Sequence, residues 1–232
     1  MGPSLREAAP PRAALTGVAL QMRALASREG GAASAPWPAG GGLEVACPAD
    51  GVTPGLPSPL LGAGTALRRL GSLDAVHAAV VAGDCAFGLL PLECSEAGPV
   101  NRSHDLLYAG AVQVVGERVL AAAPGNRRIR CGVIAAWDCP PLGCPDRLML
   151  AALLPQRTGT LVDFLAPFAA RGLSIAHWCA RPARVDGWHY RFHFTVEAPP
   201  TCPRAQEAVS EASAAALELR LLGCLQGPGA PG

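Results

Sequence analysis

Residues 86–95 read AFGLLPLECS, and this stretch decides how the first half of the chain is expected to fold. An apolar run of strand length ends at Pro91, and a polar cluster follows at once. Such a run is too short for a helix and predicts a strand buried on both faces. Because open α/β sheets bind ligands beyond the carboxyl ends of their strands, Glu93, Ser95 and the backbone amides around Gly98 are candidates for holding an oxyanion. From spacing alone, an ordinary strand-to-helix turn is favoured.

The composition is that of a globular chain with a narrow range of chemistry. Half of the 232 residues are apolar, and no apolar run is long enough to span a bilayer. The net charge of +1, with dispersed arginines, gives no electrostatic footprint for nucleic acid or a membrane. The sequence contains no lysine, which excludes Schiff-base chemistry and a phosphate-loop lysine.

The nine cysteines are scattered, and no C-x-x-C pair occurs. This pattern favours reduced thiols in the cytoplasm and argues against a zinc site. His189 and His193 fall on one face of a predicted strand, but no cysteine or acid completes a ligand set. We therefore expect these two histidines at the surface or rim of the fold, and no metal or cofactor.

Residues 88–107, GLLPLECSEAGPVNRSHDLL, resemble the signature of prephenate dehydratases, G-V-x-P-x-E-N-S-x-x-G-x-V followed by D-L-L. Residues 72–80 resemble the family's preceding helix, and residues 114–117 resemble its next strand. The matching pattern positions are held by Glu93, Ser95, Gly98 and Val100, and Cys94 replaces the family's asparagine.

The resemblance extends over residues 43–136 with clear departures. A strand is expected at 43–47, and the loop after it is a decayed form of the family's G-P-x-G-T-F-S motif. After this loop we expect a helical pattern over 59–83, a helix at 100–108 and a strand at 111–119. Residues 127–134 resemble the segment around the family's T-R-F motif, which normally lies a whole lobe further along. Arg130 is retained there, whereas Ile129 replaces the threonine and Cys131 the phenylalanine.

The second half has cleaner periodicity. Strands are expected at 148–154, 173–181, 188–196 and 218–222, with helices at 161–171 and 204–217. The Asp186-Gly187 pair is a strong hairpin signal between the second and third strands. The resulting βαββαβ order is the ferredoxin-like plan.

Residues 148–225 resemble an ACT regulatory domain of the phenylalanine-binding kind. RTGTL at 157–161 stands at the R-P-G-A-L position, and ARP at 180–182 ends the I-E-S-R-P position. WHYRF at 188–192 resembles the W-x-Y-x-F strand, and LGC at 222–224 the closing L-G-S. The resemblance implies an aromatic amino acid effector, which in this family is phenylalanine, and a homodimer or higher homo-oligomer formed through this domain. The implied effector residues are Gly159, Thr160, Leu161, Arg181 and Pro182. From the residues alone, Gly159 capping a turn and Leu161 lying in the helix core fit equally well.

The expected fold class is therefore α/β: a partial two-lobed, periplasmic-binding-protein-like dehydratase domain, its second lobe missing, followed by an α+β ferredoxin-like ACT domain. Residues 1–42 are expected to be a flexible extension with some transit-peptide character, 137–147 a Pro- and Gly-rich linker, and 226–232 a flexible tail.

The resemblance implies conversion of prephenate to phenylpyruvate, with loss of carbon dioxide and water, in phenylalanine formation. Glu93, Ser95 and Arg130 are the implied catalytic residues, and Cys94, Gly98 and Val100 the implied substrate contacts. The family's threonine is the obvious proton donor, and Ile129 has no proton to give. Two alternatives stay open: a prephenate decarboxylase that leaves the ring unaromatised, and a non-catalytic regulator in which the ACT half still binds an amino acid.

Overall fold

The computed structural model describes residues 21–22, 44–49, 65–122, 127–139, 141–142, 144–183 and 189–226. Most of the predicted terminal extensions, most of the loop after the first strand, and the Asp186-Gly187 turn lie outside the described residues.

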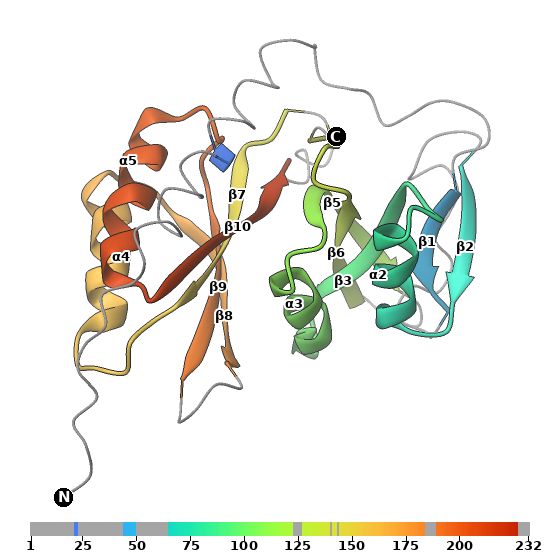
Figure 1. The fold of residues 1–232 in the computed structure, drawn as a ribbon, viewed down its shortest axis with the longest axis horizontal. Helices are drawn as coiled ribbons and strands as arrows, with labels where there is room; N and C mark the ends of the chain where they lie inside the picture. The colour runs from blue at the N-terminus through green and yellow to red at the C-terminus, as the bar shows by residue number, and fades with distance from the viewer. Residues whose placement is uncertain are drawn as a thin grey trace, which may run out of the picture.

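The described elements alternate between strands and helices along the chain (Figure 1). In the first half they are β1 (Glu44–Pro48), β2 (Ala66–Leu70), α2 (Leu73–Val81), β3 (Phe87–Cys94), β4 (Gly98–Pro99), α3 (Asn101–Tyr108), β5 (Gln113–Ala122) and β6 (Arg127–Ala135). In the second half they are β7 (Arg147–Leu153), α4 (Thr160–Ala170), β8 (Ile175–Pro182), β9 (Tyr190–Val196), α5 (Pro203–Ala212), the 3-10 turn η2 (Ser213–Ala215) and β10 (Glu218–Leu225). The second half has the predicted βαββαβ order.

All of these strands belong to one sheet, in the order β2-β1-β3-β6-β5-β10-β7-β9-β8, with β4 paired to β3. The halves meet where β10 runs parallel to β5, through the single register pair of Gly223 and Val114. In Figure 1, α4 and α5 cover the outer face of the second half, and α2 and α3 lie on the first half. The helix α3 therefore stands between the two halves.

Gly223 makes this junction possible. Its φ is +140°, and a Cβ built there would lie 2.0 Å from the carbonyl oxygen of Val114. No real side chain approaches a backbone atom so closely, so β10 can cross β5 at this point with glycine alone. The glycine of the LGC stretch is thus a packing requirement at the centre of the sheet.

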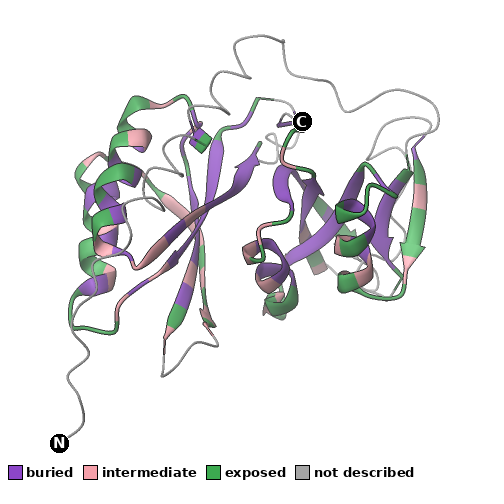
Figure 2. Cartoon of the chain, viewed as in Figure 1, coloured by how far each residue is buried: buried purple, intermediate pink, exposed green. Residues whose placement is uncertain are grey.

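Three clusters of buried apolar side chains fill the described structure, and buried positions run through both halves of the sheet (Figure 2). The first lies between α4, α5 and one face of the second half, and includes Phe164 and Phe194. The second is shared, because Leu92 and Leu107 of the first half pack with Met149 of β7. The third lies on the opposite face of the first half. The shared cluster makes the two halves one packed body.

Two sequence expectations are corrected by the structure. The helix expected over 59–83 begins at Leu73, because Ser72 caps it by accepting a hydrogen bond from the amide of Ala75. Residues 66–70 instead form β2, parallel to β1. The helix expected to reach residue 217 ends at Ala212 and continues only as the turn η2.

The expected linker and N-terminal extension also make core contacts. Leu142 is buried, and its amide donates to the carbonyl oxygen of Val115 at 2.6 Å, so this part of 137–147 is packed onto β5. Met22 is helical and 1% exposed, and it belongs to the core beneath α4 and α5. Burying an apolar side chain such as that of Met22 in a core is favourable by about 1.5–3 kcal/mol.

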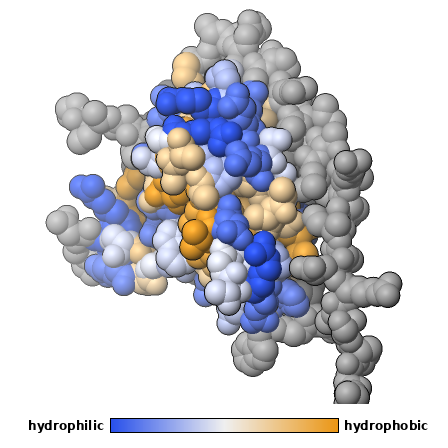
Figure 3. All heavy atoms as spheres, turned by 90° about the vertical axis from the view of Figure 1, so that its left-hand side faces the viewer, coloured by the Kyte–Doolittle hydropathy of each residue, from blue (hydrophilic) through white to orange (hydrophobic). Residues whose placement is uncertain are grey.

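The face formed by α4 and α5 shows hydrophilic side chains interspersed with apolar ones (Figure 3). Val162 on α4 is the most exposed of the large apolar side chains in the described residues, at 70%. Within the same residues, no helix is long and apolar enough to cross a membrane.

Candidate functional site

A small cavity lies between the two halves, beside α3. The first half lines it with Leu92, Glu93, Pro99, His104 and Arg130, and the second half with Met149, His177, Trp178, Cys179, His193, Phe194 and Thr195. Its volume is about 20 Å³. A buried water needs roughly 10–15 Å³ of such space, so the cavity admits little more than one water.

A β-bulge aims Glu93 into this cavity. In the pairing of β3 with β6, Pro91 faces Cys131 and Glu93 faces Arg130, so Leu92 is the extra residue. The insertion puts Leu92 and Glu93 on the same face of the sheet, which strict alternation forbids. The bulge therefore turns the end of the strand toward α3 and the second half.

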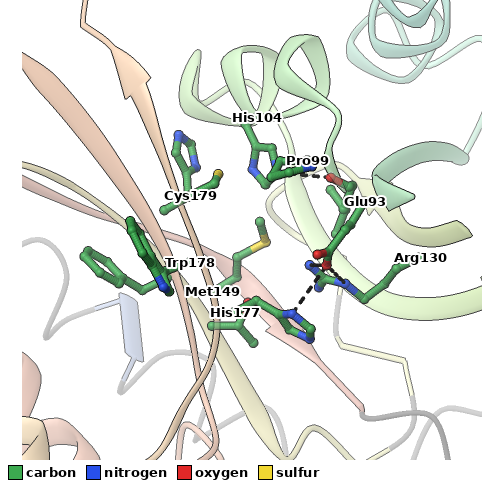
Figure 4. Close-up of a pocket in the computed structure, with 12 residues that line it drawn as sticks. Glu93, Pro99, His104, Arg130, Met149, His177, Trp178 and Cys179 are labelled. Atoms are coloured by element: carbon green, nitrogen blue, oxygen red, sulfur yellow. Dashed lines mark hydrogen bonds and ion pairs between the residues drawn. The ribbon is translucent and has the colours of Figure 1, made fainter. Parts of the chain in front are cut away.

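Glu93 and Arg130 point toward each other across the paired strands, and His177 reaches the same carboxylate from β8 (Figure 4). The guanidinium of Arg130 donates from Nε at 3.2 Å and Nη2 at 3.0 Å, both to Glu93 Oε2. His177 Nδ1 lies 3.3 Å from the same oxygen. One edge of the Arg130 fork is thus already used by Glu93, so the guanidinium cannot hold a ligand carboxylate through that edge.

A second carboxylate supports Arg130 from within the fold. Glu117 on β5 has a side chain 1% exposed, with Oε1 3.6 Å from Arg130 Nε and Oε2 3.1 Å from Arg147 Nη2. Burial raises the pKa of Glu117, against the lowering effect of the two arginines. Glu117 on β5 therefore holds Arg130 of the first half and Arg147 on β7 of the second half in one buried set of ion pairs.

Ile129, at the position of the threonine in the family's T-R-F motif, lies in the core and not at the cavity. Ile129 is 1% exposed and belongs to the third core cluster, on the face of β6 opposite Arg130. Cys94 is its register partner and shares that face. Because neighbouring strand residues point to opposite faces, neither side chain is directed into the cavity. Cys94, expected as a substrate contact, is therefore not brought together with Glu93.

Ser95, Gly98 and Val100 lie just beyond the strand rather than inside the cavity. The amide of Ser95 donates to the Arg128 carbonyl oxygen at 2.9 Å, and its Oγ accepts from the Arg128 amide at 3.0 Å. The amide of Val100 donates to the Leu92 carbonyl oxygen. Two of the amides expected to hold an oxyanion are thus occupied by backbone partners, and Pro99 is the member of this turn that lines the cavity.

Two buried histidines were not expected here. His104 on α3 is 4% exposed and His193 on β9 is 2% exposed, with ring centroids 4.8 Å apart. The expectation of a surface His193 is wrong, because the face of β9 opposite α4 and α5 is covered by the first half. Burial lowers the pKa of His104 to about 4 and that of His193 to about 3. The alternation of Arg191, His193 and Thr195 with phenylalanines in β9 is the sequence signal for a second covered face.

Arg181 joins the two halves instead of lining an effector site. Its Nη2 lies 2.8 Å from Asp105 Oδ2, and Arg191 Nη2 lies 3.5 Å from Asp105 Oδ1. These side chains are 11–17% exposed. We call Asp105, Arg181 and Arg191 the Asp105 latch.

A larger groove of about 400 Å³ lies at the start of α4. It is lined by Leu154, Pro155, Gln156, Arg157, Thr158, Thr160, Leu161, Tyr190 and Phe192. Gly159 precedes the helix with φ +86°, a conformation that favours glycine. Pro182 is the register partner of Tyr190, so it lies next to this groove. Four of the five expected effector residues therefore lie at or beside one hollow, and Arg181 does not.

Comparison with known proteins gives matches over part of the chain by sequence. Residues 59–123 match the sequence pattern of the family described as prephenate dehydratase. A prephenate dehydratase of Amycolatopsis methanolica is 32% identical over 89 residues, which are 36% of this chain and 29% of that protein. The chain thus matches less than a third of the length of this curated relative.

The fold likeness extends further than the sequence likeness. A structure described as GqqA, a novel type of quorum quenching acylase, matches with a TM-score of 0.71 at 21% identity, over 81% of this chain and 98% of that one. The prephenate dehydratase of Streptococcus mutans matches with a TM-score of 0.62 at 20% identity, over 79% and 97%. The enzyme from Arthrobacter aurescens in complex with L-Phe gives 0.64 at 14% identity, over 79% and 90%. Residues 59–123 of this chain are therefore similar in sequence to the prephenate dehydratase family, within a mixed α/β fold that resembles the structures of prephenate dehydratases.

Proposed function

We propose that this protein processes prephenate at the cavity between its two halves, as a prephenate dehydratase-type lyase in aromatic amino acid biosynthesis in the cytoplasm. The observation that carries the proposal is the pairing of Glu93 with Arg130 inside a cavity, both on elements of the dehydratase-like half. Arg130 retains one guanidinium nitrogen, Nη1, that is buried without a hydrogen-bond partner. A substrate carboxylate is the group that such a donor binds best.

The second half supplies what the shortened first half lacks. Only residues 123–126 separate β5 from β6, which leaves no room for a second lobe there. In its place, β7, β8 and β9 provide the opposite wall of the cavity through Met149, His177 and His193. The enclosed site thus depends on both halves.

The direct test is turnover of prephenate by the purified full chain, followed by phenylpyruvate absorbance and by carbon dioxide release. We expect the variant Arg130→Gln to lower kcat/KM about 10²-fold, because it removes a charged donor from the carboxylate. Arg128→Gln is the matched control, since Arg128 lies two residues away on the same strand and is exposed. Equal activity of the two variants would refute the assignment of Arg130.

Non-aromatising decarboxylation is a second candidate, favoured by the position of Ile129. That reaction does not expel the hydroxyl, so it does not need the family's threonine as a proton donor. Carbon dioxide release without phenylpyruvate would establish it. Absence of both products, together with stabilisation by phenylalanine, would establish the third candidate, a non-catalytic regulator.

The cavity does not favour the hydrolysis of an acyl group, the activity for which the structurally similar GqqA is described. Hydrolysis of an acyl group commonly uses an activated nucleophile. The thiol in the cavity lining, Cys179, has its pKa raised to about 11 by burial, so it is protonated and unreactive near neutral pH.

For regulation, we propose that residues 148–225 form an ACT domain whose groove at the start of α4 binds phenylalanine. The groove has the volume of a small-molecule site and combines Leu161, Tyr190 and Phe192 with the polar loop at Arg157. L-phenylalanine should raise the melting temperature and D-phenylalanine should not. The variant Leu161→Asp should abolish the shift, whereas Val162→Asp, on the exposed side of α4, should retain it.

The proposed ACT domain also suggests how copies of the chain associate. β8 is at the end of the strand order, and Trp178 on it is 63% exposed. A strand edge with an exposed aromatic side chain is a natural pairing surface. Sedimentation should show a homodimer or larger assembly that Trp178→Asp weakens; a monomer at all concentrations would refute this assembly.

A further inference from the structure

His104 and His193 form a buried pair that the proposed reaction has not yet used. Both rings line the same cavity as Glu93 and Arg130, one from α3 and one from β9. Three of their four ring nitrogens are buried without a hydrogen-bond partner: His104 Nδ1 and both nitrogens of His193. Leaving buried polar atoms unpaired is costly, so such a cluster calls for an occupant.

The proton positions on the two rings follow from their partners. His104 Nε2 lies 3.2 Å from the carbonyl oxygen of Leu92, which can only accept. Nε2 therefore carries the proton, and Nδ1 presents a lone pair. His193 in its neutral form offers one N–H and one lone pair. The pKa values of both rings are lowered by burial, which keeps them neutral near pH 7. Together the pair presents one donor and two acceptors.

The ion pairs around the cavity leave one donor of Arg130 for an anion at the other end of the cavity. Four arginines (Arg130, Arg147, Arg181 and Arg191) are linked by ion pairs to four carboxylates (Glu93, Glu117, Asp105 and Asp146), so the network is balanced in charge. Arg130 lines the cavity, and its Nη1 is buried without a hydrogen-bond partner, so this nitrogen is the donor that an anion in the cavity would meet.

We propose that the cavity is a site for a small hydroxy acid, whose carboxylate binds Arg130 Nη1 and whose hydroxyl lies between His104 and His193. A hydroxyl both donates and accepts, so it can satisfy lone pairs and an N–H together. A second carboxylate would meet two lone pairs, and an apolar group would leave all three nitrogens unpaired. This inference rests on the proposed function and deepens it, because the group that leaves prephenate on dehydration is a hydroxyl.

The cavity must widen to take such a ligand, since it has room for little more than one water. The side chains at its open rim, Glu93 and His177, are 35% and 37% exposed, and rotation of these side chains is the widening that the proposal requires. An ordered water on the two rings is the competing occupant, and the experiment separates it from the acid.

The test compares two probes that differ by one hydroxyl, 4-hydroxycyclohexanecarboxylate and cyclohexanecarboxylate, by calorimetric titration of the full chain. The wild type should bind the hydroxy acid about 5- to 10-fold more tightly, as expected for one hydrogen-bonded group. His193→Phe keeps an aromatic ring without nitrogens and should reduce the preference to about 2-fold or less. His193→Gln, which has both a donor and an acceptor, should restore it. Arg130→Gln should weaken both acids and keep the preference.

A spectroscopic measurement covers the case in which His193→Phe fails to fold. In ¹⁵N-histidine spectra of the wild type, the unprotonated Nδ1 of His104 should shift on addition of the hydroxy acid and not of the plain acid. No preference in the wild type, a preference retained in His193→Phe, or no binding of either acid would overturn the inference and leave an ordered water only.

These outcomes are separate from the fate of the proposed function. Prephenate turnover without any hydroxyl preference would refute the hydroxyl site at His104 and His193 and leave the proposed enzyme activity intact. A hydroxyl preference without turnover would refute the enzyme activity and leave the hydroxyl site intact.

Discussion

Leu92 is a single extra residue in a strand, and it determines which side chains can act together. By shifting the register after Pro91, it places Glu93 on the face of Arg130 and leaves Cys94 with Ile129 on the other. The resemblance to the family pointed to both Glu93 and Arg130, and the structure places Arg130 Nη2 3.0 Å from Glu93 Oε2. It could not show which face each side chain occupies, because a bulge depends on pairing between strands 37 residues apart.

Restoring the family's threonine should therefore not restore its chemistry. We expect Ile129→Thr to leave prephenate turnover unchanged, because position 129 points into the third core cluster. It should lower the free energy of unfolding by about 2–3 kcal/mol, since it removes buried carbon and buries a hydroxyl. Urea unfolding and the turnover assay give both results, and Ile129→Val, costing about 1 kcal/mol, is the size control. A rise in turnover in Ile129→Thr would contradict this geometry.

The two buried histidines predict a loss of stability in mild acid. Their pKa values in the folded protein, about 4 and about 3, lie below the ordinary value of 6.5. Between pH 6.5 and 4 the unfolded chain therefore binds protons that the folded chain does not, and stability falls as the pH falls. From pH 7 to 4.5, we expect the loss in His193→Phe to be about 2–3 kcal/mol smaller than in the wild type.

Urea unfolding at several pH values measures this difference. His189→Gln is the control, because His189 lies just before β9 and is only half-buried. Parallel pH profiles for the wild type and His193→Phe would show that His193 is not kept neutral by the fold.

Among the elements, β10 is the one on which the architecture depends, and Gly223 is its critical position. Gly223→Ala would place a methyl group 2.0 Å from a backbone oxygen that cannot move away without breaking the sheet. We expect a loss of at least about 4 kcal/mol or failure to fold. Gly83→Ala is the matched control: φ there is also positive, at +79°, but no atom lies within 4 Å of the added Cβ. Its expected cost is about 1–2 kcal/mol, from backbone strain alone.

Thermal unfolding of the two variants separates steric exclusion from strain. Similar melting temperatures for Gly223→Ala and Gly83→Ala would mean that β5 and β10 do not approach as closely as described.

Elements with a strong local pattern could be predicted from the sequence, and those defined by distant contacts could not. The alternating strands and the first helix of the second half are predicted within a few residues, as is the buried strand at 87–94, whereas the second helix ends five residues before its expected end. The strand at 66–70 was mistaken for a helix, because its leucines also fit a helical spacing and its partner β1 lies far away in sequence. The shared face of β9 was missed for the same reason.

For the molecule as a whole, the Asp105 latch determines how firmly the halves hold together. Asp105→Asn leaves Arg181 and Arg191 without their shared carboxylate in a largely buried seam. Removing one partner of a buried pair typically costs about 3–5 kcal/mol, and we expect about 3. Asp74→Asn breaks an exposed pair with Arg102 and should cost under about 1 kcal/mol.

Chemical denaturation gives the two costs, and amide exchange gives their location. Exchange should quicken in α3 and β9 for Asp105→Asn and only near α2 for Asp74→Asn. A uniform change in both variants would contradict a localised latch.

The contact of Val114 with Gly223 has a consequence for how the protein is made. The ribosome adds Gly223 109 residues after Val114, so this edge of β5 lacks its partner strand during the synthesis of the second half. During that interval the nascent chain exposes a strand edge of the kind that recruits chaperones or sticks to its neighbours. Translation speed and chaperone supply should therefore govern the yield of this protein more than the intrinsic stability of either half.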